Sequence, residues 1–169
     1  MHDFTERTAR IVGLGTALPS RKMTNQDFEK IVDTADEWIV QRAGMRVRYH
    51  VGPDESLVTM AVAAGKRALE DAGVAPEEVE LLVLATATPE QPIPSSASIV
   101  QPQIGLKNAT CFDIAAACSG FLYALNIARQ FIRNGEVSTA MVIGAEALSR
   151  YTDFTDRGTC ILFGDGAGA

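Results

Sequence analysis

Two hydrophobic periodicities alternate along the chain, and together they predict strands and helices in turn. Nearly continuous apolar runs at 80–86, 110–114 and 139–147 are typical of strands buried on both faces. Between them, apolar residues recur at helical spacing over 56–73 and 118–135. This order predicts crossover connections and an α/β fold, with a mostly parallel sheet and helices on both faces.

Shorter patterns complete the prediction. Thr24 is a residue type that caps helices, and Gly44 and Gly105 are typical of helix ends. The remaining predicted elements are a first strand over 10–16, a helix from Thr24 to Val32, helical turns over 35–44, a strand over 45–50, a helix from Ser95 or Ser96 towards Gly105, and a strand beginning within 158–169. The last run is apolar and rich in glycine, and domains seldom end inside a strand. We therefore expect the intact protein to continue beyond Ala169.

Length and composition exclude several classes of protein. The 169 residues, 47 % of them hydrophobic, suffice for one domain with a core. No apolar run reaches the length of about 18 residues that spans a membrane, and the N-terminus does not read as a signal peptide, so we expect a cytoplasmic protein. The net charge of −6 argues against a nucleic-acid partner. Three widely spaced cysteines suit neither a disulfide framework nor a zinc site, and we expect no metal.

Cys118 is the cysteine whose setting is compatible with chemistry. It follows a predicted strand and begins a predicted helix, where the helix dipole and backbone N–H groups favour a thiolate. Small residues on both sides leave room for a substrate. Buried cysteines mostly act as small hydrophobes, however, and this local pattern alone favours an inert core residue. Cys111 and Cys160 lie in apolar runs and are expected in the core.

A nucleophilic cysteine usually needs a base or an orienting partner. The chain has two histidines: His2 lies at the terminus, and His50 lies at a predicted strand end. Nothing in the sequence directs either of them to Cys118. Two glycine patterns also fail as nucleotide motifs, since "GLGTAL" lacks a third glycine and "FGDGAGA" lacks the lysine of a P-loop. The second pattern is interpreted as close backbone packing around the thiol.

The stretch "DTADEWIVQRAGMRVR" combines the single tryptophan with several arginines. Arg42 lies four residues beyond Trp38, which is one helical turn, and Arg46 and Arg48 follow. An aromatic face beside guanidinium groups can stack on a base and bind phosphates. An anchoring tryptophan on a solvated basic surface explains the pattern equally well.

Taken together, these segments resemble β-ketoacyl-acyl-carrier-protein synthase III, the starter condensing enzyme of bacterial fatty-acid synthesis. The resemblance rests on "GLGTALP", "DTADEWIVQRAGMRVR", "LLVLATATPE", "FDIAAACSGF", "DRGT" and "FGDGAGA", which occur in the family's order. It implies a thiolase-like fold of two similar α/β halves. Residues 1–169 are then the N-terminal domain carrying the nucleophile, and the C-terminal half is absent.

The resemblance implies roles for eight residues. Cys118 matches the nucleophile that accepts a short acyl group from acyl-CoA. For binding CoA, Trp38 and Arg157 match residues that sandwich the adenine, and Thr34 and Arg42 match residues that contact the base and phosphates. The implied acyl-pocket residues are Leu148, Phe163 and Ile93, the last of which reaches across a homodimer interface. An aromatic side chain stands at that position in many relatives, so the smaller Ile93 implies more room.

The implied reaction has two stages and needs no cofactor, because acyl-CoA is a substrate. Cys118 first becomes acylated; malonyl-acyl carrier protein then loses CO₂ and its carbanion attacks the acyl-cysteine. The histidine and asparagine that assist the second stage come from the C-terminal half in the family, so His50 and Asn126 are not assigned to those roles. Alternatives are a polyketide starter synthase, a hydroxymethylglutaryl-CoA-type synthase, or a half-domain inactive in condensation.

Overall fold

A five-stranded mixed sheet forms the centre of the molecule. The structure is a computed structural model, and it describes residues 7–169. The strands of this sheet are β1 (Thr16–Ala17), β4 (Leu81–Ala85), β5 (Thr110–Ile114), β6 (Ala140–Ala147) and β7 (Asp165–Gly168). Their spatial order is β1-β7-β6-β4-β5; β4 is parallel to β5 and β6, whereas β7 is antiparallel to β6 and β1.

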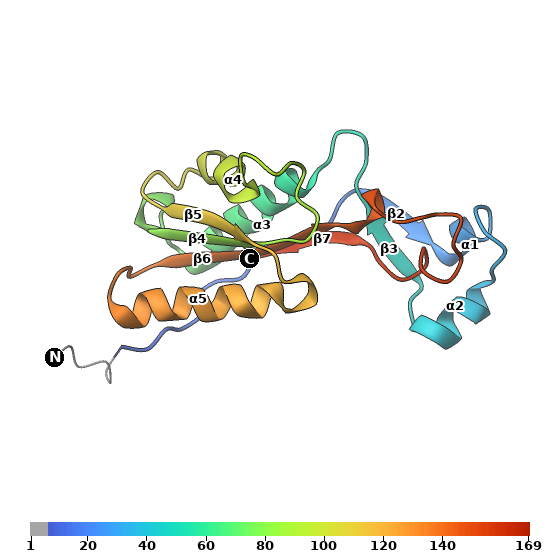
Figure 1. Ribbon diagram of the computed structural model, residues 1–169, viewed down its shortest axis with the longest axis horizontal. Helices are drawn as coiled ribbons and strands as arrows, with labels where there is room; N and C mark the ends of the chain where they lie inside the picture. The colour runs from blue at the N-terminus through green and yellow to red at the C-terminus, as the bar shows by residue number, and fades with distance from the viewer. Residues whose placement is uncertain (1–6) are drawn as a thin grey trace.

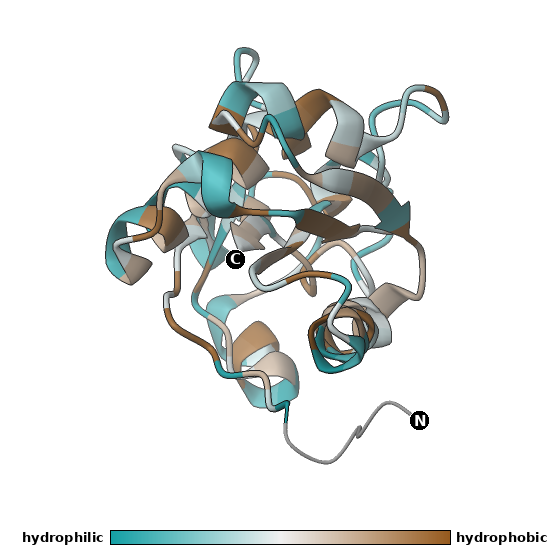
Figure 2. Ribbon diagram, turned by 90° about the vertical axis from the view of Figure 1, so that its left-hand side faces the viewer, coloured by the Kyte–Doolittle hydropathy of each residue, from teal (hydrophilic) through white to brown (hydrophobic). Residues whose placement is uncertain are grey.

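Helices cover both faces of this sheet, as the sequence predicted (Figure 1). Helices α3 (Leu57–Ala72) and α4 (Ser96–Ile104) pack on one face, and α5 (Gly120–Asn134) packs on the other. Strand β4 is buried along its whole length because Leu82 and Leu84 face α3 and α4, while Leu81 and Val83 face α5. In Figure 2 the helices change between hydrophobic and hydrophilic colours around their turns, as expected for helices with one face on a core. No helix within residues 7–169 is long and apolar enough to cross a membrane.

The predicted helix ends are confirmed where a local signal sets them. The Ser56 side chain accepts a hydrogen bond from the backbone N–H of Thr59, which caps α3. Gly73, Gly105 and Gly135 end α3, α4 and α5 in the left-handed conformation that glycine adopts without strain. These boundaries depend on neighbours in sequence, so the sequence pattern locates them well.

A small lobe lies beside the main sheet (Figure 1). It contains β2 (Arg21–Thr24) and β3 (Val47–His50), which pair antiparallel, with α1 (Asn25–Phe28) and α2 (Asp36–Ala43). Its apolar core comprises Met23, Phe28, Ile39, Cys160 and Ile161. Because Cys160 and Ile161 come from the segment before β7, this late segment of the chain ties the lobe to the main sheet.

Two predicted elements are corrected. The first strand, predicted over 10–16, is reduced to Thr16–Ala17, and the helix predicted from Thr24 to Val32 ends at Phe28. After Phe28 the chain tightens into turns, in which the N–H groups of Ile31 and Val32 both donate to the Phe28 carbonyl. A strand forms only where its backbone has a partner to pair with. The pairing of β1 with β7 ends in two hydrogen bonds between Gly15 and Ala169, the residues next to these strands. The apolar residues before Gly15 therefore pair with no strand. His2 lies outside the described residues.

Candidate active site

Cys118 lies in a tight turn between β5 and α5. The turn is the short 3₁₀ helix η2 (Ala117–Ser119), and α5 begins at Gly120 rather than at Cys118 as predicted. Ala117 has a φ of 45°, a left-handed conformation that costs a non-glycine residue on the order of 1–3 kcal/mol. Such strain is typical of functional sites, and here it immediately precedes an exposed cysteine. The Cys118 thiol is therefore presented to solvent rather than buried as core.

A hollow of about 310 Å³ opens beside Cys118. Its walls include Phe121 of α5, Gly144 of β6, and Gly166 and Gly168 of β7. The packing is tight at one point of this wall: a Cβ atom on Gly144 would lie 3.1 Å from Cδ2 of Phe121, so the Phe121 ring would have to shift by a few tenths of an ångström. The interpretation of "FGDGAGA" as close packing around the thiol agrees with this wall, which consists mainly of backbone and short side chains.

Glu146 also lines the hollow, and the sequence reasoning did not single it out. Its carboxylate accepts hydrogen bonds from the backbone N–H of Ala87 at 2.8 Å and from the hydroxyl of Thr88 at 2.6 Å. The Thr88 hydroxyl in turn accepts from the N–H of Ala147 at 2.9 Å. An acidic residue in the otherwise apolar strand "TAMVIGAEA" was the available signal, because a carboxylate there needs specific partners.

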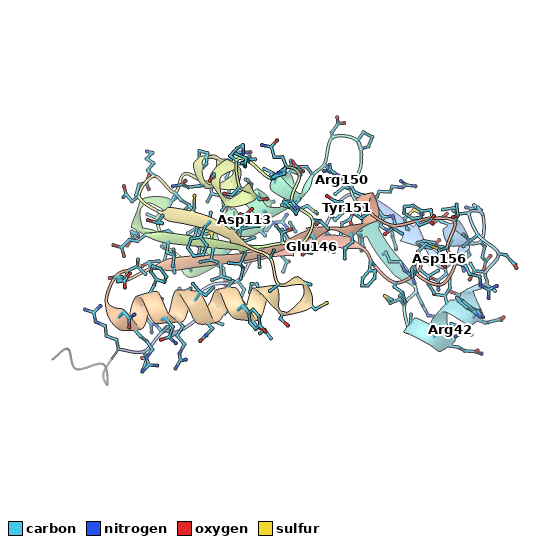
Figure 3. All side chains as sticks on the ribbon, viewed as in Figure 1. Arg42, Asp113, Glu146, Arg150, Tyr151 and Asp156 are labelled. Carbon is cyan, nitrogen blue, oxygen red and sulfur yellow. The ribbon has the colours of Figure 1, made fainter. Side chains whose placement is uncertain are left out.

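Two carboxylates fix the ends of the loop that carries Ile93. Glu146 holds the start of the loop, and Asp113 accepts 2.7 Å hydrogen bonds from the N–H groups of Ser96 and Ala97 at its end. Figure 3 shows Glu146 and Asp113 on their separate strands of the main sheet. Ile93 itself is 86 % exposed, so an apolar side chain projects from a loop with fixed ends.

The predicted acyl-pocket residues are not gathered around the hollow. Ile93 points into solvent, Phe163 is 49 % exposed, and Leu148 is half-buried in the 3₁₀ helix η3 (Leu148–Arg150). None of these three side chains lines the hollow beside Cys118 within the described residues. Their assignment to an acyl pocket stays a prediction.

Asp165 connects the start of β7 to the two segments beside it. It is buried, and its carboxylate accepts from the N–H of Val51 at 2.7 Å and from the N–H of Ser149 at 2.8 Å. The small lobe, η3 and β7 thus meet at one acidic side chain, which holds the glycine-rich wall of the hollow in position.

Trp38, Arg42 and Arg157 come together in the small lobe. The guanidinium carbon of Arg42 lies 4.4 Å from the centre of the indole ring, and that of Arg157 lies 4.3 Å from it. Arg42 lies on α2, whereas Arg157 comes from the segment before β7, and Figure 3 shows Arg42 near Asp156 at this end of the molecule. A base that stacked on Trp38 between the ring and Arg157 would have to displace that guanidinium group.

Thr34 and Asp33 lie just before α2. The Thr34 hydroxyl is buried and has no hydrogen-bond partner within residues 7–169, which is uncommon for a buried polar group. Arg157 lies 3.7 Å from the Asp33 carboxylate, but the Asp33 side chain is fully exposed and the pair is weak. The Arg157 side chain is thus held mainly by the indole ring.

His50 is not a partner for Cys118. It is 2 % exposed and lies against the rings of Phe28 and Phe154, in the small lobe. Burial lowers its pKa, while the nearby Asp165 carboxylate opposes this shift. Asn126 is exposed on α5.

The other two cysteines differ from Cys118. Cys160 is fully buried in the small-lobe core, and burial raises its thiol pKa, as expected for an inert residue. Cys111 is half-buried in β5, and its thiol donates to Oε1 of Gln101 at 3.2 Å. No group of three or more histidine, cysteine or acidic residues within residues 7–169 is arranged to hold a metal ion.

Comparisons with known proteins bear on the family to which the chain is similar. Residues 112–169 match the family model of 3-oxoacyl-[acyl-carrier-protein] synthase III. The chain is 51 % identical over 163 residues to the β-ketoacyl-[acyl-carrier-protein] synthase III of Rhizorhabdus wittichii, covering 96 % of this chain and 51 % of the relative. The synthase III of Clostridium acetobutylicum is 50 % identical over 162 residues, with 96 % and 50 % covered.

Solved structures show the same fold. The crystal structure of 3-oxoacyl-[acyl-carrier-protein] synthase III from Aquifex aeolicus has a TM-score of 0.92 at 51 % identity, covering 94 % of this chain and 51 % of that one. The priming β-ketosynthase of the R1128 polyketide pathway has a TM-score of 0.94 at 39 % identity, with 96 % and 48 % covered.

The fold and the exposed cysteine turn define a thiolase-like α/β protein. Within that class, the resemblance to β-ketoacyl-[acyl-carrier-protein] synthase III is confirmed over nearly the whole chain. The chain spans about half the length of the curated relatives it matches.

Proposed function

We propose that this chain is the nucleophile-bearing N-terminal part of a 3-oxoacyl-ACP synthase III. Such an enzyme starts type II fatty-acid synthesis by forming acetoacetyl-ACP from an acyl-CoA and malonyl-ACP. The observation that carries the proposal is the exposed Cys118 thiol, which follows a strained residue and faces a hollow lined by glycine and alanine.

The first step is acyl transfer to sulfur. The Cys118 thiolate attacks the thioester carbonyl of acyl-CoA, the new C–S bond forms, and CoA leaves as its thiolate. The negative charge on the carbonyl oxygen needs hydrogen-bond donors, and we assign one of them to the Cys118 backbone N–H. Losing such a donor typically lowers the rate by about 10²–10³-fold. The small side chains of the hollow leave space for the acyl group beside the sulfur.

The small lobe is the proposed CoA site. Trp38 and Arg157 offer the two faces that sandwich the adenine, and Arg42 and Thr34 offer groups that contact the base and phosphates. Arg157 closes over the base only after it has moved from its present position on the indole ring. This supports a site that rearranges when the nucleotide binds.

The second step needs groups that the described residues do not bring to the thiol. We propose that the decarboxylation of malonyl-ACP and the Claisen condensation use residues from a C-terminal half, and that the 169-residue chain alone does not condense. We further propose a cytoplasmic homodimer in which Ile93 reaches the pocket of the partner subunit, and in which Leu148 and Phe163 complete the acyl pocket.

Acylation of the isolated chain tests the first step. The chain is incubated with acetyl-CoA and its intact mass is measured, beside Cys118→Ala and the matched control Cys111→Ala. We expect one acetyl group on the wild type and on Cys111→Ala, and none on Cys118→Ala. An acetyl group on Cys118→Ala would overturn the assignment of the nucleophile.

A polyketide starter synthase is the second candidate, since the R1128 priming β-ketosynthase has a TM-score of 0.94 with this chain. The two candidates differ in the acyl-CoA and the carrier protein that they accept. Panels of acyl-CoA substrates and of carrier-protein acceptors, tested on a full-length form, separate them: condensation with a fatty-acid carrier protein supports the synthase III assignment, and condensation only with a polyketide carrier protein favours the polyketide assignment.

A further inference from the structure

Arg48, on β3, is a charged side chain buried inside the small lobe. It is 3 % exposed, and none of the ion pairs within residues 7–169 includes it. Its guanidinium carbon lies 5.0 Å from the centre of the Phe28 ring, and its Nη2 atom has no hydrogen-bond partner in the described part of the chain. Burying a charge without a counter-ion costs free energy. An apolar side chain of similar size would avoid this cost, so the hydrogen bonds that Arg48 does make indicate a role other than packing.

One hydrogen bond of Arg48 reaches the segment that carries Arg157. The Nε atom of Arg48 donates to the carbonyl oxygen of Ile161 at 2.6 Å. Ile161 follows Cys160, whose N–H donates to the Asp156 carbonyl at 3.0 Å and so closes a tight turn. Arg157 lies inside this turn. The position of Ile161 therefore sets the point from which the Arg157 side chain extends to the indole ring.

A second hydrogen bond reaches the start of the helix that carries Trp38. The Nη1 atom of Arg48 donates to Oδ1 of Asn25, which is fully buried. The amide nitrogen of Asn25 donates to Oδ1 of Asp36 at 2.7 Å and to the carbonyl of Met45 at 2.9 Å, which fixes the orientation of this side chain. Asp36 is the first residue of α2 and lies two residues before Trp38. Arg48 is therefore connected to α2 through one intervening side chain.

We propose that Arg48 is a positioning residue for the CoA site: it holds α2 and the Arg157 segment at the separation at which Trp38 and Arg157 face each other. This inference rests on the proposed function of the small lobe. The two residues are far apart in the sequence, yet the Arg157 guanidinium carbon lies 4.3 Å from the centre of the indole ring. The ion pair of Arg157 with the exposed Asp33 is weak and does not hold this arrangement.

The shape of the guanidinium group suits this role. Apolar packing also joins the two segments, because Ile39 of α2 and Ile161 belong to the same small-lobe core. Such packing is not directional. By contrast, the planar guanidinium fork directs Nε and Nη1 along fixed lines, so its two acceptors, on Ile161 and Asn25, must keep one distance and one angle. A lysine ammonium at this position would have the charge but not the fork.

Substitution of Arg48 tests the proposal in the 169-residue chain. Arg48→Met removes both hydrogen bonds and keeps an apolar stem, and Arg48→Lys keeps the charge without the fork. Leu106→Ala is the matched control, because it weakens the core of the main sheet and lies outside the small-lobe core. Each variant is also combined with Arg157→Ala. All proteins are compared at a temperature at which circular dichroism shows them folded.

The affinity for CoA is measured by isothermal titration calorimetry. We expect both Arg48 variants to bind CoA about tenfold more weakly than the wild type, whereas Leu106→Ala should bind like the wild type despite its lower stability. Adding Arg157→Ala should cost about tenfold in the wild type but less than about threefold in the Arg48 variants, because Arg157 is already displaced there.

Three results would overturn the proposal. The first is wild-type affinity in either Arg48 variant, and the second is that the effects of the Arg48 and Arg157 substitutions simply multiply. The third is an equal loss of affinity in Leu106→Ala, which would assign the loss to stability alone. If Arg48→Met does not fold, Arg48→Lys decides.

A second readout does not need CoA. Trp38 is the only tryptophan in the chain, so tryptophan fluorescence reports on this indole ring alone. Acrylamide should quench it more strongly in the Arg48 variants and in Arg157→Ala than in the wild type or Leu106→Ala, because the ring loses the guanidinium group on its face. If the wild type binds no CoA, the proposed function of the small lobe fails, and quenching alone decides the positioning role. Unchanged quenching in the Arg48 variants would overturn that role.

Discussion

The thiol region and the indole region of this molecule are built in opposite ways. Around Cys118, the walls are backbone and short side chains, and a single added carbon on Gly144 would meet Phe121. Around Trp38, two long arginine side chains lie on an aromatic ring at the surface of the small lobe. The thiol region is bounded mainly by backbone and short side chains, whereas the indole region is bounded by long side chains that can move.

This difference indicates how each region would respond to ligand. A rigid hollow can hold an acyl carbonyl in one geometry, which suits a covalent step. Flexible arginines can follow phosphates and a base, which suits recognition and release. Substitutions should therefore damage stability in the first region and affinity in the second.

The largest expected effect on stability is at Gly15, the residue before β1, whose backbone packs against α3. A Cβ atom there would lie 2.1 Å from the backbone oxygen of Ala64. A backbone atom cannot relieve this clash by changing a rotamer, as a side chain can. Gly15→Ala should lower the free energy of unfolding by about 3 kcal/mol in urea titrations. Gly168→Ala is the control, since its Cβ would meet nothing within 4 Å, and it should change stability by less than about 0.5 kcal/mol. Equal effects of the two variants would contradict the close packing of this layer.

Thr88 tests whether the thiol region also depends on side-chain hydrogen bonds. Its buried hydroxyl joins the Glu146 carboxylate to the N–H of Ala147. Thr88→Val keeps the shape, removes one hydrogen bond from the Glu146 carboxylate and leaves the N–H of Ala147 without its partner, and should cost roughly 1–3 kcal/mol in the same titration. Thr155→Val, which removes an exposed hydroxyl, should be nearly neutral. A neutral Thr88→Val would show that water replaces the hydroxyl.

In the small lobe, Arg157 should affect affinity rather than stability. Arg157→Ala removes the group that we propose to cover the adenine opposite Trp38, so the affinity of the variant for CoA should fall about tenfold, measured by isothermal titration calorimetry. Arg129→Ala removes the same charge from the exposed side of α5 and should leave affinity unchanged. If both variants bind equally weakly, net charge rather than the indole cluster governs CoA binding.

The smallest effect concerns pH and the small-lobe core. Burial lowers the pKa of His50, so the unfolded chain binds a proton at this residue more readily than the folded chain. Stability should therefore increase as pH rises from below to above the ordinary histidine pKa of about 6.5. His50→Gln should flatten this dependence in unfolding experiments at several pH values. An unchanged slope would show that other groups control it.

Much of the fold could be predicted from local signals. The caps at Ser56 and Gly73 act within one helical turn, so the sequence locates α3 closely. The predicted bounds of the first strand were wrong. The apolar residues Ile11, Val12 and Leu14 indicate a preference for burial, but they do not indicate whether a neighbouring strand is present to pair with them. Glu146 was missed because its partners lie about sixty residues away in the chain.

The sequence by itself determined the order of strands and helices, and it identified Cys118 as the cysteine at the turn between a strand and a helix. It also placed Trp38 and Arg42 one helical turn apart, since such spacing depends only on local geometry. Only the tertiary structure decided that the Cys118 thiol is exposed beside a hollow and that Arg157 joins Trp38. These features depend on contacts between distant segments, and hydrophobic periodicity records burial without recording which segments meet.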